Sequence, residues 1–97
     1  MARFVVLMDF TEQGIKSVKE SPQRAAQAKA AFKAKGVEIE RVYWTLGSHD
    51  VVAIVRAADG LDLAAVLLDL GGAGNVRTTT LRAFDEAEFA TVLSKLG

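Results

Sequence analysis

Residues 37–57 read VEIERVYWTLGSHDVVAIVRA, and they contain two β-favouring runs that meet at a tight turn. The first run covers residues 37–46 and the second covers residues 49–57, and both are rich in β-branched and aromatic side chains. Gly47-Ser48 lies between them and is typical of a hairpin, because glycine supplies the backbone freedom that a tight turn needs. This stretch therefore predicts an antiparallel hairpin in the middle of the chain.

The sequence on either side of the hairpin predicts two further strands and several helices. Ser21-Pro22 is a helix start signal, and Asp85 is another, completed by Glu88 as a capping box. Thr11 and Gln13 predict a capping box for a short helical turn. The expected strands lie at residues 3–10 and 75–84, the expected helices at residues 23–35 and 61–70, and the helix after Asp85 carries an apolar stripe of Phe89, Val92, Leu93 and Leu96.

The order of these elements, βαββαβ followed by a terminal helix, is typical of the ferredoxin-like α+β fold. That fold has an antiparallel sheet in the order 4-1-3-2 with its helices on one face. The first and third strands are apolar at their centres, as central strands should be. The second and fourth strands contain the charged and polar residues that are typical of edge strands. We expect residues 1–97 to form one domain of this kind.

Composition excludes several classes of partner and chemistry. Twelve basic residues balance twelve acidic ones, so no overall field attracts nucleic acid or an anionic membrane. The chain has no cysteine, which excludes disulfides, thiolate metal sites and thiol catalysis. A lone histidine with scattered carboxylates does not predict a metal site, and no cofactor motif is present. No apolar run is long enough for a membrane span or signal peptide, so we expect a cytoplasmic protein without nucleic-acid or membrane partners and without a cofactor.

One face of the predicted sheet is apolar but has no helix to cover it. Val5 and Leu7 of the first strand share this face with Val52 and Ile54 of the third. We expect Val42 and Trp44 to extend the patch. An apolar patch of this size usually marks an interface, which predicts a homodimer or larger homo-oligomer. The alternative is that the terminal helix folds back over the same face.

Polar residues gather at one end of the predicted sheet. Asp9 ends the first strand, His49 and Asp50 follow the hairpin turn, and Arg77 opens the fourth strand. The carboxylates of Asp9 and Asp50 lie on neighbouring strands and on the same face, so they need a cation between them, and Arg77 is the candidate. The cluster is either a small-ligand site, with Tyr43, Trp44 or Phe10 as apolar walls, or an ion-paired end of the sheet. His49 is accordingly either a structural residue or a base that titrates near neutral pH.

These residues resemble the GYD domain family, which is named for a Gly-x-Tyr-Asp motif after an aromatic-Trp-Thr-Leu run. The matching stretch here is Tyr43-Trp44-Thr45-Leu46-Gly47-Ser48-His49-Asp50, in which His49 stands at the tyrosine position. Further matching segments are residues 11–16, Ser21-Pro22, residues 75–84 and Glu88-Phe89. The resemblance implies a place in the dimeric α+β barrel superfamily, in which two open sheet faces pack together and each subunit keeps a cavity. It implies no particular activity.

Two functions are consistent with this sequence. The first is a homo-oligomeric module that binds a small molecule, or acts in regulation or assembly, at the polar end of its sheet. Its polar groups would be Asp9, His49, Asp50 and Arg77. The alternative is a cofactor-independent enzyme of the monooxygenase or isomerase type, with His49 or Asp50 as general base. Only analogy with the fold supports that alternative.

Overall fold

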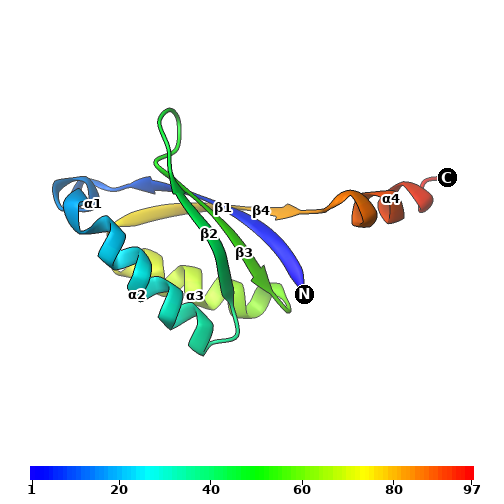
Figure 1. The fold of residues 1–97 in the computed structure, drawn as a ribbon, viewed down its shortest axis with the longest axis horizontal. Coiled ribbons are helices and arrows are strands. Elements are labelled where there is room, and N and C mark those ends of the chain that lie inside the picture. The colour runs from blue at the N-terminus through cyan, green and yellow to red at the C-terminus, as the bar shows by residue number, and fades with distance from the viewer.

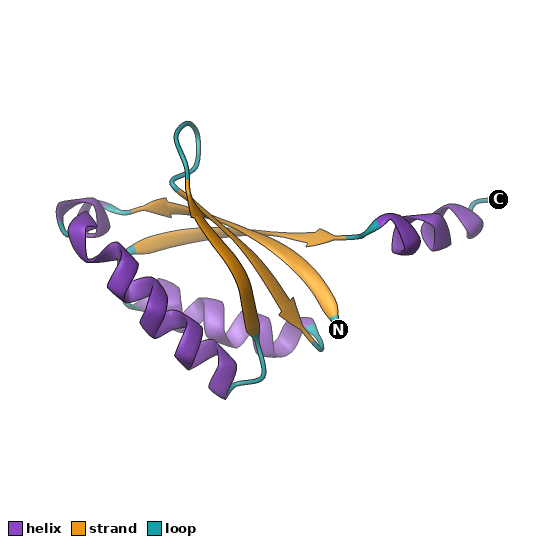
Figure 2. Ribbon diagram, viewed as in Figure 1, coloured by secondary structure: helices purple, strands orange, loops and turns teal.

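A four-stranded antiparallel sheet forms the centre of the protein, in the order β2-β3-β1-β4. The structure is a computed structural model that describes all 97 residues (Figures 1 and 2). Its elements are β1 (Ala2–Phe10), α1 (Glu12–Lys16), the 3-10 turn η1 (Val18–Glu20), α2 (Ser21–Ala34), β2 (Glu38–Trp44), β3 (Val51–Ala57), α3 (Gly60–Gly72), β4 (Val76–Ala83) and α4 (Glu86–Ser94). The predicted ferredoxin-like α+β fold and its strand order are therefore confirmed.

The two central strands bury one face and leave the other open. In β3, buried residues alternate with half-buried ones from Val51 to Ala57, as a strand with one covered face should. Helices α2 and α3 lie on the covered side (Figure 2). Ten apolar residues form the core between them and the sheet: Val6, Met8, Phe32, Val37, Val51, Ala53, Val55, Ala57, Leu63 and Val66. Each fully buried valine there contributes roughly 1.5–3 kcal/mol, so this side supplies most of the stability.

A β-bulge changes the phase of β2 along its length. Ile39 pairs with Val55, but the next paired residue is Arg41 with Ile54, so Glu40 is the extra residue. Beyond the bulge, Val42 pairs with Ala53 on the covered side and Tyr43 pairs with Val52 on the open side. The expectation that Val42 and Trp44 extend the open apolar face was wrong, because the bulge exchanges the two faces of the strand.

The helix starts follow the predictions in part. Asp85 and Glu88 form the predicted capping box at α4, with reciprocal bonds of 2.7 and 3.1 Å. Thr11 caps α1 by accepting from the Gly14 amide, but the Gln13 side chain turns away from Thr11 and donates to the Ala73 carbonyl. Ser21 is not a cap, since α2 starts at it without a side-chain cap bond.

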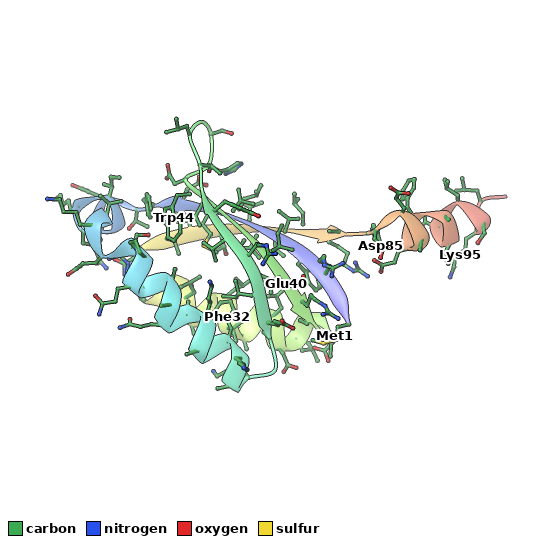
Figure 3. The ribbon with its side chains drawn as sticks, viewed as in Figure 1. Met1, Phe32, Glu40, Trp44, Asp85 and Lys95 are labelled. Atoms are coloured by element: carbon green, nitrogen blue, oxygen red, sulfur yellow. The ribbon has the colours of Figure 1, made fainter.

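Helix α4 projects from the sheet as an arm and covers nothing (Figure 1). Every α4 residue except Glu88 is exposed. Its base is held by β4, because Arg82 pairs with Glu88 at 3.2 Å and stacks over the Phe84 ring at 4.5 Å. The alternative that the terminal helix folds back over the open sheet face is therefore not the conformation of this chain. Asp85 and Lys95 mark the two ends of the arm in Figure 3.

Candidate functional site

An apolar cavity of about 380 Å³ lies between the sheet and helices α2 and α3. Its volume is within the usual range for a small-molecule site. Fifteen of its 21 lining residues are hydrophobic. The α2 wall includes Ala25, Ala28 and Ala31, whose short side chains leave space opposite Met8 and Ala53. The alanine content that favours this helix thus also leaves the cavity beneath it.

Polar groups are concentrated at the end of the cavity where α2 begins. The Trp44 indole Nε1 donates to Ser21 Oγ at 3.0 Å, and Ser21 is buried. Arg24, one turn further along α2, donates through Nη1 to the Ser17 carbonyl and to Ser17 Oγ, both at 3.1 Å. Its other terminal nitrogen, Nη2, is the one buried side-chain polar atom in the protein without a hydrogen-bond partner. Both Ser21 and Arg24 line the cavity.

The predicted polar cluster lies outside this cavity, at the hairpin end of the sheet. His49 Nδ1 is 3.1 Å from Asp9 Oδ1, and both side chains are about one-third to two-fifths exposed, at 35% and 42%. No group of three or more histidine and acidic side chains is placed to hold a metal ion. The side chain beside Asp9 is thus the His49 imidazole rather than Arg77.

Asp50 is fixed by the backbone of β1. Its Oδ2 accepts a hydrogen bond of 2.9 Å from the Phe10 amide, and its own amide donates to the Met8 carbonyl at 2.9 Å. Arg77 lies opposite Asp9 in the register, but it is exposed and forms no ion pair. We expected Asp50 to be partnered by Arg77 or by backbone amides, and the structure has the amide contact rather than the ion pair. The carboxylate thus ties the hairpin end to β1.

Among the expected apolar walls, Trp44 and Phe10 line the cavity and Tyr43 does not. Tyr43 is exposed and pairs with Val52 on the open face. His49 and Asp50 do not line the cavity either. The two groups that the enzymatic alternative needs as bases thus lie outside this cavity.

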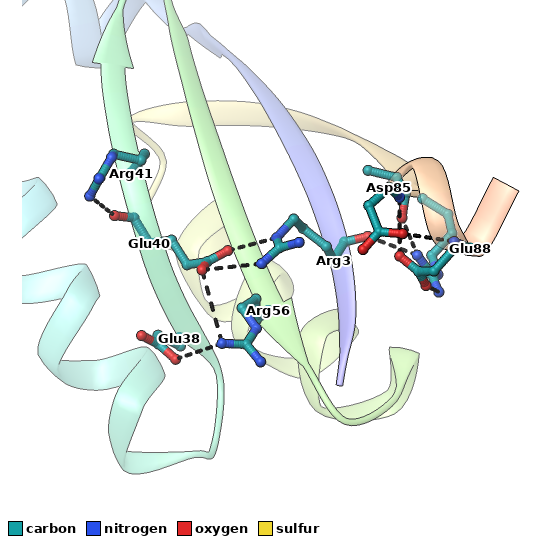
Figure 4. A network of polar contacts seen from close by, with 9 residues as sticks. Arg3, Glu38, Glu40, Arg41, Arg56, Asp85 and Glu88 are labelled. Carbon is teal, nitrogen blue, oxygen red and sulfur yellow. Dashed lines mark hydrogen bonds and ion pairs between the residues drawn. The ribbon is translucent and has the colours of Figure 1, made fainter. Parts of the chain in front are cut away.

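The open face of the sheet has an apolar centre between two polar ends. Val5 pairs with Ile54 and Leu7 with Val52, and all four are half-buried. Leu81 extends this centre onto β4 opposite Val5 and is exposed. The His49–Asp9 contact lies at one end, and an ion-paired group of Arg3, Glu38, Glu40 and Arg56 lies at the other (Figure 4). An apolar centre with a polar rim is the usual composition of a protein–protein interface.

Glu40 holds the ion-paired end together. Arg3 Nε donates to Glu40 Oε1 at 2.9 Å, and Arg56 Nη1 is 4.0 Å from Glu40 Oε2. The hydrogen bond from Arg3 lowers the pKa of Glu40 below its usual value, and the same bond raises the pKa of Arg3. Glu40 is the bulged residue of β2, so the bulge directs its carboxylate toward Arg3.

Sequence reasoning missed two residues of these sites. Arg24 was overlooked because it is one of several polar residues in an alanine-rich helix, although its spacing of three from Ser21 places both on one helix face. Gly14 was also overlooked. It is buried, and a Cβ atom there would lie only 1.9 Å from the Asn75 carbonyl oxygen. The close approach of α1 to β4 needs glycine at this position.

Comparison with known proteins agrees with the fold and the hairpin motif. Residues 4–93 match the GYD domain. The chain belongs to the GYD domain family. A relative in Thermus thermophilus is 32% identical over 89 residues, which cover 91% of this chain and 94% of that protein. That relative is named "Glutamine synthetase and cystathionine beta-lyase binding protein". No solved structure matches the chain significantly.

The GYD domain match covers most of β1, the other three strands, both long helices and most of the arm. It therefore includes the cavity, the open face and α4 within one family unit. None of the helices of this GYD protein combines the length and apolar character needed to cross a bilayer.

Proposed function

We propose that this GYD protein is a homo-oligomeric binding module that acts on other proteins by association rather than by catalysis. The observation that carries the proposal is the surface that one chain leaves unpartnered. The open sheet face is apolar at Val5, Leu7, Val52 and Ile54 and has no cover. The α4 arm carries a second apolar surface, with Phe89 and Leu93 each 51% exposed, and it packs against nothing.

The exposed area agrees in size with a dimer interface. One chain exposes 6448 Å². A compact monomer of 10.4 kDa is expected to expose about 5,400 Å², so the excess is about 1,000 Å². A standard interface removes about 800 Å² from each partner. The radius of gyration of 14.6 Å likewise exceeds the roughly 12.5 Å expected for a compact chain of this length.

The contacts at the base of α4 hold the arm away from its own subunit. Its base is fixed by the Asp85 capping box and by the Arg82–Glu88 pair, and both hold α4 in the direction that points away from the sheet. Because the arm does not cover its own sheet face, we expect the two copies to exchange arms. Each α4 then packs its apolar stripe on the second copy. The open faces of two copies would then be enclosed between two sheets and two arms.

The relative supports the wider role of this assembly. The name of the Thermus protein describes binding to two enzymes, glutamine synthetase and cystathionine beta-lyase. We extend that class of role, the binding of other proteins, to this chain. A test is co-elution of this protein with each purified enzyme in size-exclusion chromatography. Separate elution from both enzymes would contradict the extension.

The homo-oligomer is tested by a charge at the centre of the open face. Ile54→Glu should dissociate it, because an unpaired charge buried in an interface costs several kcal/mol. Leu68→Glu is the matched control, since Leu68 is an exposed residue of α3. We expect multi-angle light scattering to give an oligomer for the parent and for Leu68→Glu, and a folded monomer for Ile54→Glu. A monomeric parent, or an Ile54→Glu variant of unchanged mass, would refute the proposal.

A further inference from the structure

We infer that the outer face of α3 docks another protein, through a partner surface that is apolar and carries basic side chains on its flank. The inference rests on the proposed role in binding other proteins, and it adds the docking face of this chain and the chemistry of the partner. Helix α3 lies on the covered side of the sheet, whereas the proposed subunit interface lies on the open side (Figure 2). The two surfaces can therefore be tested separately.

Helix α3 carries two apolar stripes rather than one. The inner stripe lies in or against the core and consists of Leu63, Val66, Leu67 and Leu70. The outer stripe repeats the same spacing two residues earlier, and all of its members are exposed: Leu61, Ala64, Ala65 and Leu68. An offset of two residues is about 200° around a helix, so the two stripes lie on opposite sides of α3.

The outer stripe is open to solvent in the single chain. Leu61 is 81% exposed and Leu68 is 76% exposed. Helix α3 packs on β3, β4 and α2, and none of these elements covers the two leucines. A helix that is apolar on all sides is normally buried on all sides, so an apolar outer face indicates a partner.

The neighbouring helix α2 has the polar outer face that is usual for a helix in contact with water. Its one large apolar side chain, Phe32, is buried. Its exposed positions include polar and basic residues: Gln23, Gln27, Lys29 and Lys33. Both helices cover the same side of the sheet, so their position in the fold does not explain the exposed leucines of α3.

The charged residues of α3 are all acidic. Asp62 and Asp69 directly follow the two leucines of the outer stripe, so both lie on the same side of it. Asp62 forms no ion pair, whereas Asp69 pairs with Lys35 at 2.8 Å. The helix itself contains no basic residue. Basic side chains on a partner would complement this flank, and acidic ones would be repelled.

These charges disfavour a second copy of the chain as the occupant. A two-fold contact between α3 helices would bring Asp62 and Asp69 of both chains into one interface. The α4 arm of a second copy has Glu86 and Glu88 in its first turn, and the exposed face of α2 offers lysines but no large apolar side chain. An anionic membrane is disfavoured by the same acidic flank. The occupant that fits both the stripe and the charges is a protein surface with apolar and basic side chains.

A synthetic peptide tests the chemistry of the partner. The probe is a helical peptide of about 18 residues, long enough to form a helix, with leucines along one face and lysines on the other. The matched control peptide has glutamate in place of every lysine. Fluorescence anisotropy should give saturable binding of the lysine peptide. The glutamate peptide should bind at least about ten-fold more weakly, with a smaller difference at high salt.

Variants place the peptide on the outer stripe. Leu68→Lys should weaken binding of the lysine peptide at least about ten-fold, because it removes an apolar contact and adds a like charge. Gln23→Lys adds the same charge to the exposed face of α2 and should change the affinity by less than about two-fold. Leu61→Lys repeats the test at the other end of the stripe. Circular dichroism shows that each variant is folded, as expected for exposed positions.

The acidic flank is tested by removal of one charge. Asp62→Asn should weaken binding of the lysine peptide about three-fold and make the affinity less dependent on salt. Glu86→Gln removes one acidic charge from α4 and is the matched control, which should leave both unchanged. Equal effects of the two variants would show that net charge, rather than the flank of the stripe, attracts the peptide, and would overturn the charge part of the inference.

Three further results would overturn the inference: no saturable binding of the lysine peptide, equal binding of the two peptides, or unchanged affinity in Leu68→Lys. A smaller assembly of Leu68→Lys in light scattering would make α3 a contact between copies, and sedimentation of the parent with phosphatidylserine vesicles would make it a membrane contact. Either result would also overturn the inference.

The proposed function fails by different measurements. Ile54→Glu tests the oligomer, and co-elution with the two enzymes tests the wider role. If an enzyme co-elutes with the parent, Leu68→Lys should abolish that co-elution. Co-elution that persists in Leu68→Lys would refute the docking face and leave the proposed function intact.

Discussion

At the scale of single residues, the hairpin end is held by one carboxylate and one glycine rather than by a charged cluster. Asp50 fixes the turn to the Phe10 amide of β1, and Gly14 lets α1 approach the Asn75 carbonyl of the β4 entrance. The sequence indicates the importance of Asp50 through its place after the turn. It does not indicate its partner, because a side chain at a strand end is not fixed by the pleat.

Removal of the Asp50 carboxylate should therefore be a stability effect. Asp50→Ala leaves the Phe10 amide without its acceptor, which should lower the free energy of unfolding by about 1–3 kcal/mol. Asp50→Asn keeps an oxygen acceptor at that position, so its free energy of unfolding should be much closer to that of the parent. Urea unfolding monitored by circular dichroism measures both. Equal losses in the two variants would show that charge, rather than the hydrogen bond, is what matters at this position.

At Gly14, two opposing effects of alanine can be compared. Alanine favours a helix over glycine by up to about 1 kcal/mol. The added Cβ would lie 1.9 Å from the Asn75 oxygen, however, and overpacking against backbone typically costs about 1–3 kcal/mol. Gly14→Ala should thus be destabilising, whereas Gly71→Ala, with nothing within 4 Å, should be neutral or slightly stabilising. A thermal melt in which Gly14→Ala is the more stable variant would contradict this account.

At the scale of elements, most of the fold could be predicted because the capping residues, the turn residues and the hydrophobic periodicity indicate the same helices and strands. The four strands and the two long helices lie within a few residues of their expected bounds. The faces of β2 could not be predicted beyond Glu40. Alternation counted from Val37 places Trp44 on the open face, and only the paired strand reveals that the bulge reverses this. The position of the cavity under α2 was missed for a related reason, since the effect of short side chains depends on which face they share.

The bulge also makes one ion pair of the sheet sensitive to acid. Because Arg3 holds the pKa of Glu40 below its usual value, the pair contributes stability above the ordinary glutamate pKa. That contribution is lost as the pH falls through the lowered folded pKa. Glu40→Gln should therefore destabilise the protein at pH 7 and have progressively less effect as the pH is lowered below about 4. Urea titrations across this range measure the difference, and a pH-independent difference would contradict the role of the charge.

At the scale of the whole molecule, we propose that the arm and the open face form one subunit interface. Phe89→Asp combined with Leu93→Asp places charges on the apolar stripe of α4 and should dissociate the oligomer as Ile54→Glu does. The monomer should remain folded, because α4 contributes no residue to the buried core. Thr91→Asp, on the opposite side of α4, is the matched control. Native mass spectrometry distinguishes the two, and an oligomer that persists in the double variant would exclude arm exchange.

The two faces of the central strands have a consequence for measured affinities. Val51 and Ala53 line the cavity, while their neighbours Val52 and Ile54 belong to the open face. An occupant of the cavity and a partner subunit on the open face would thus contact the same backbone. By thermodynamic reciprocity, any factor by which an occupant of the cavity changes self-association must also be the factor by which self-association changes the affinity for that occupant. Dissociation constants measured for this protein are therefore complete only when the protein concentration is stated with them.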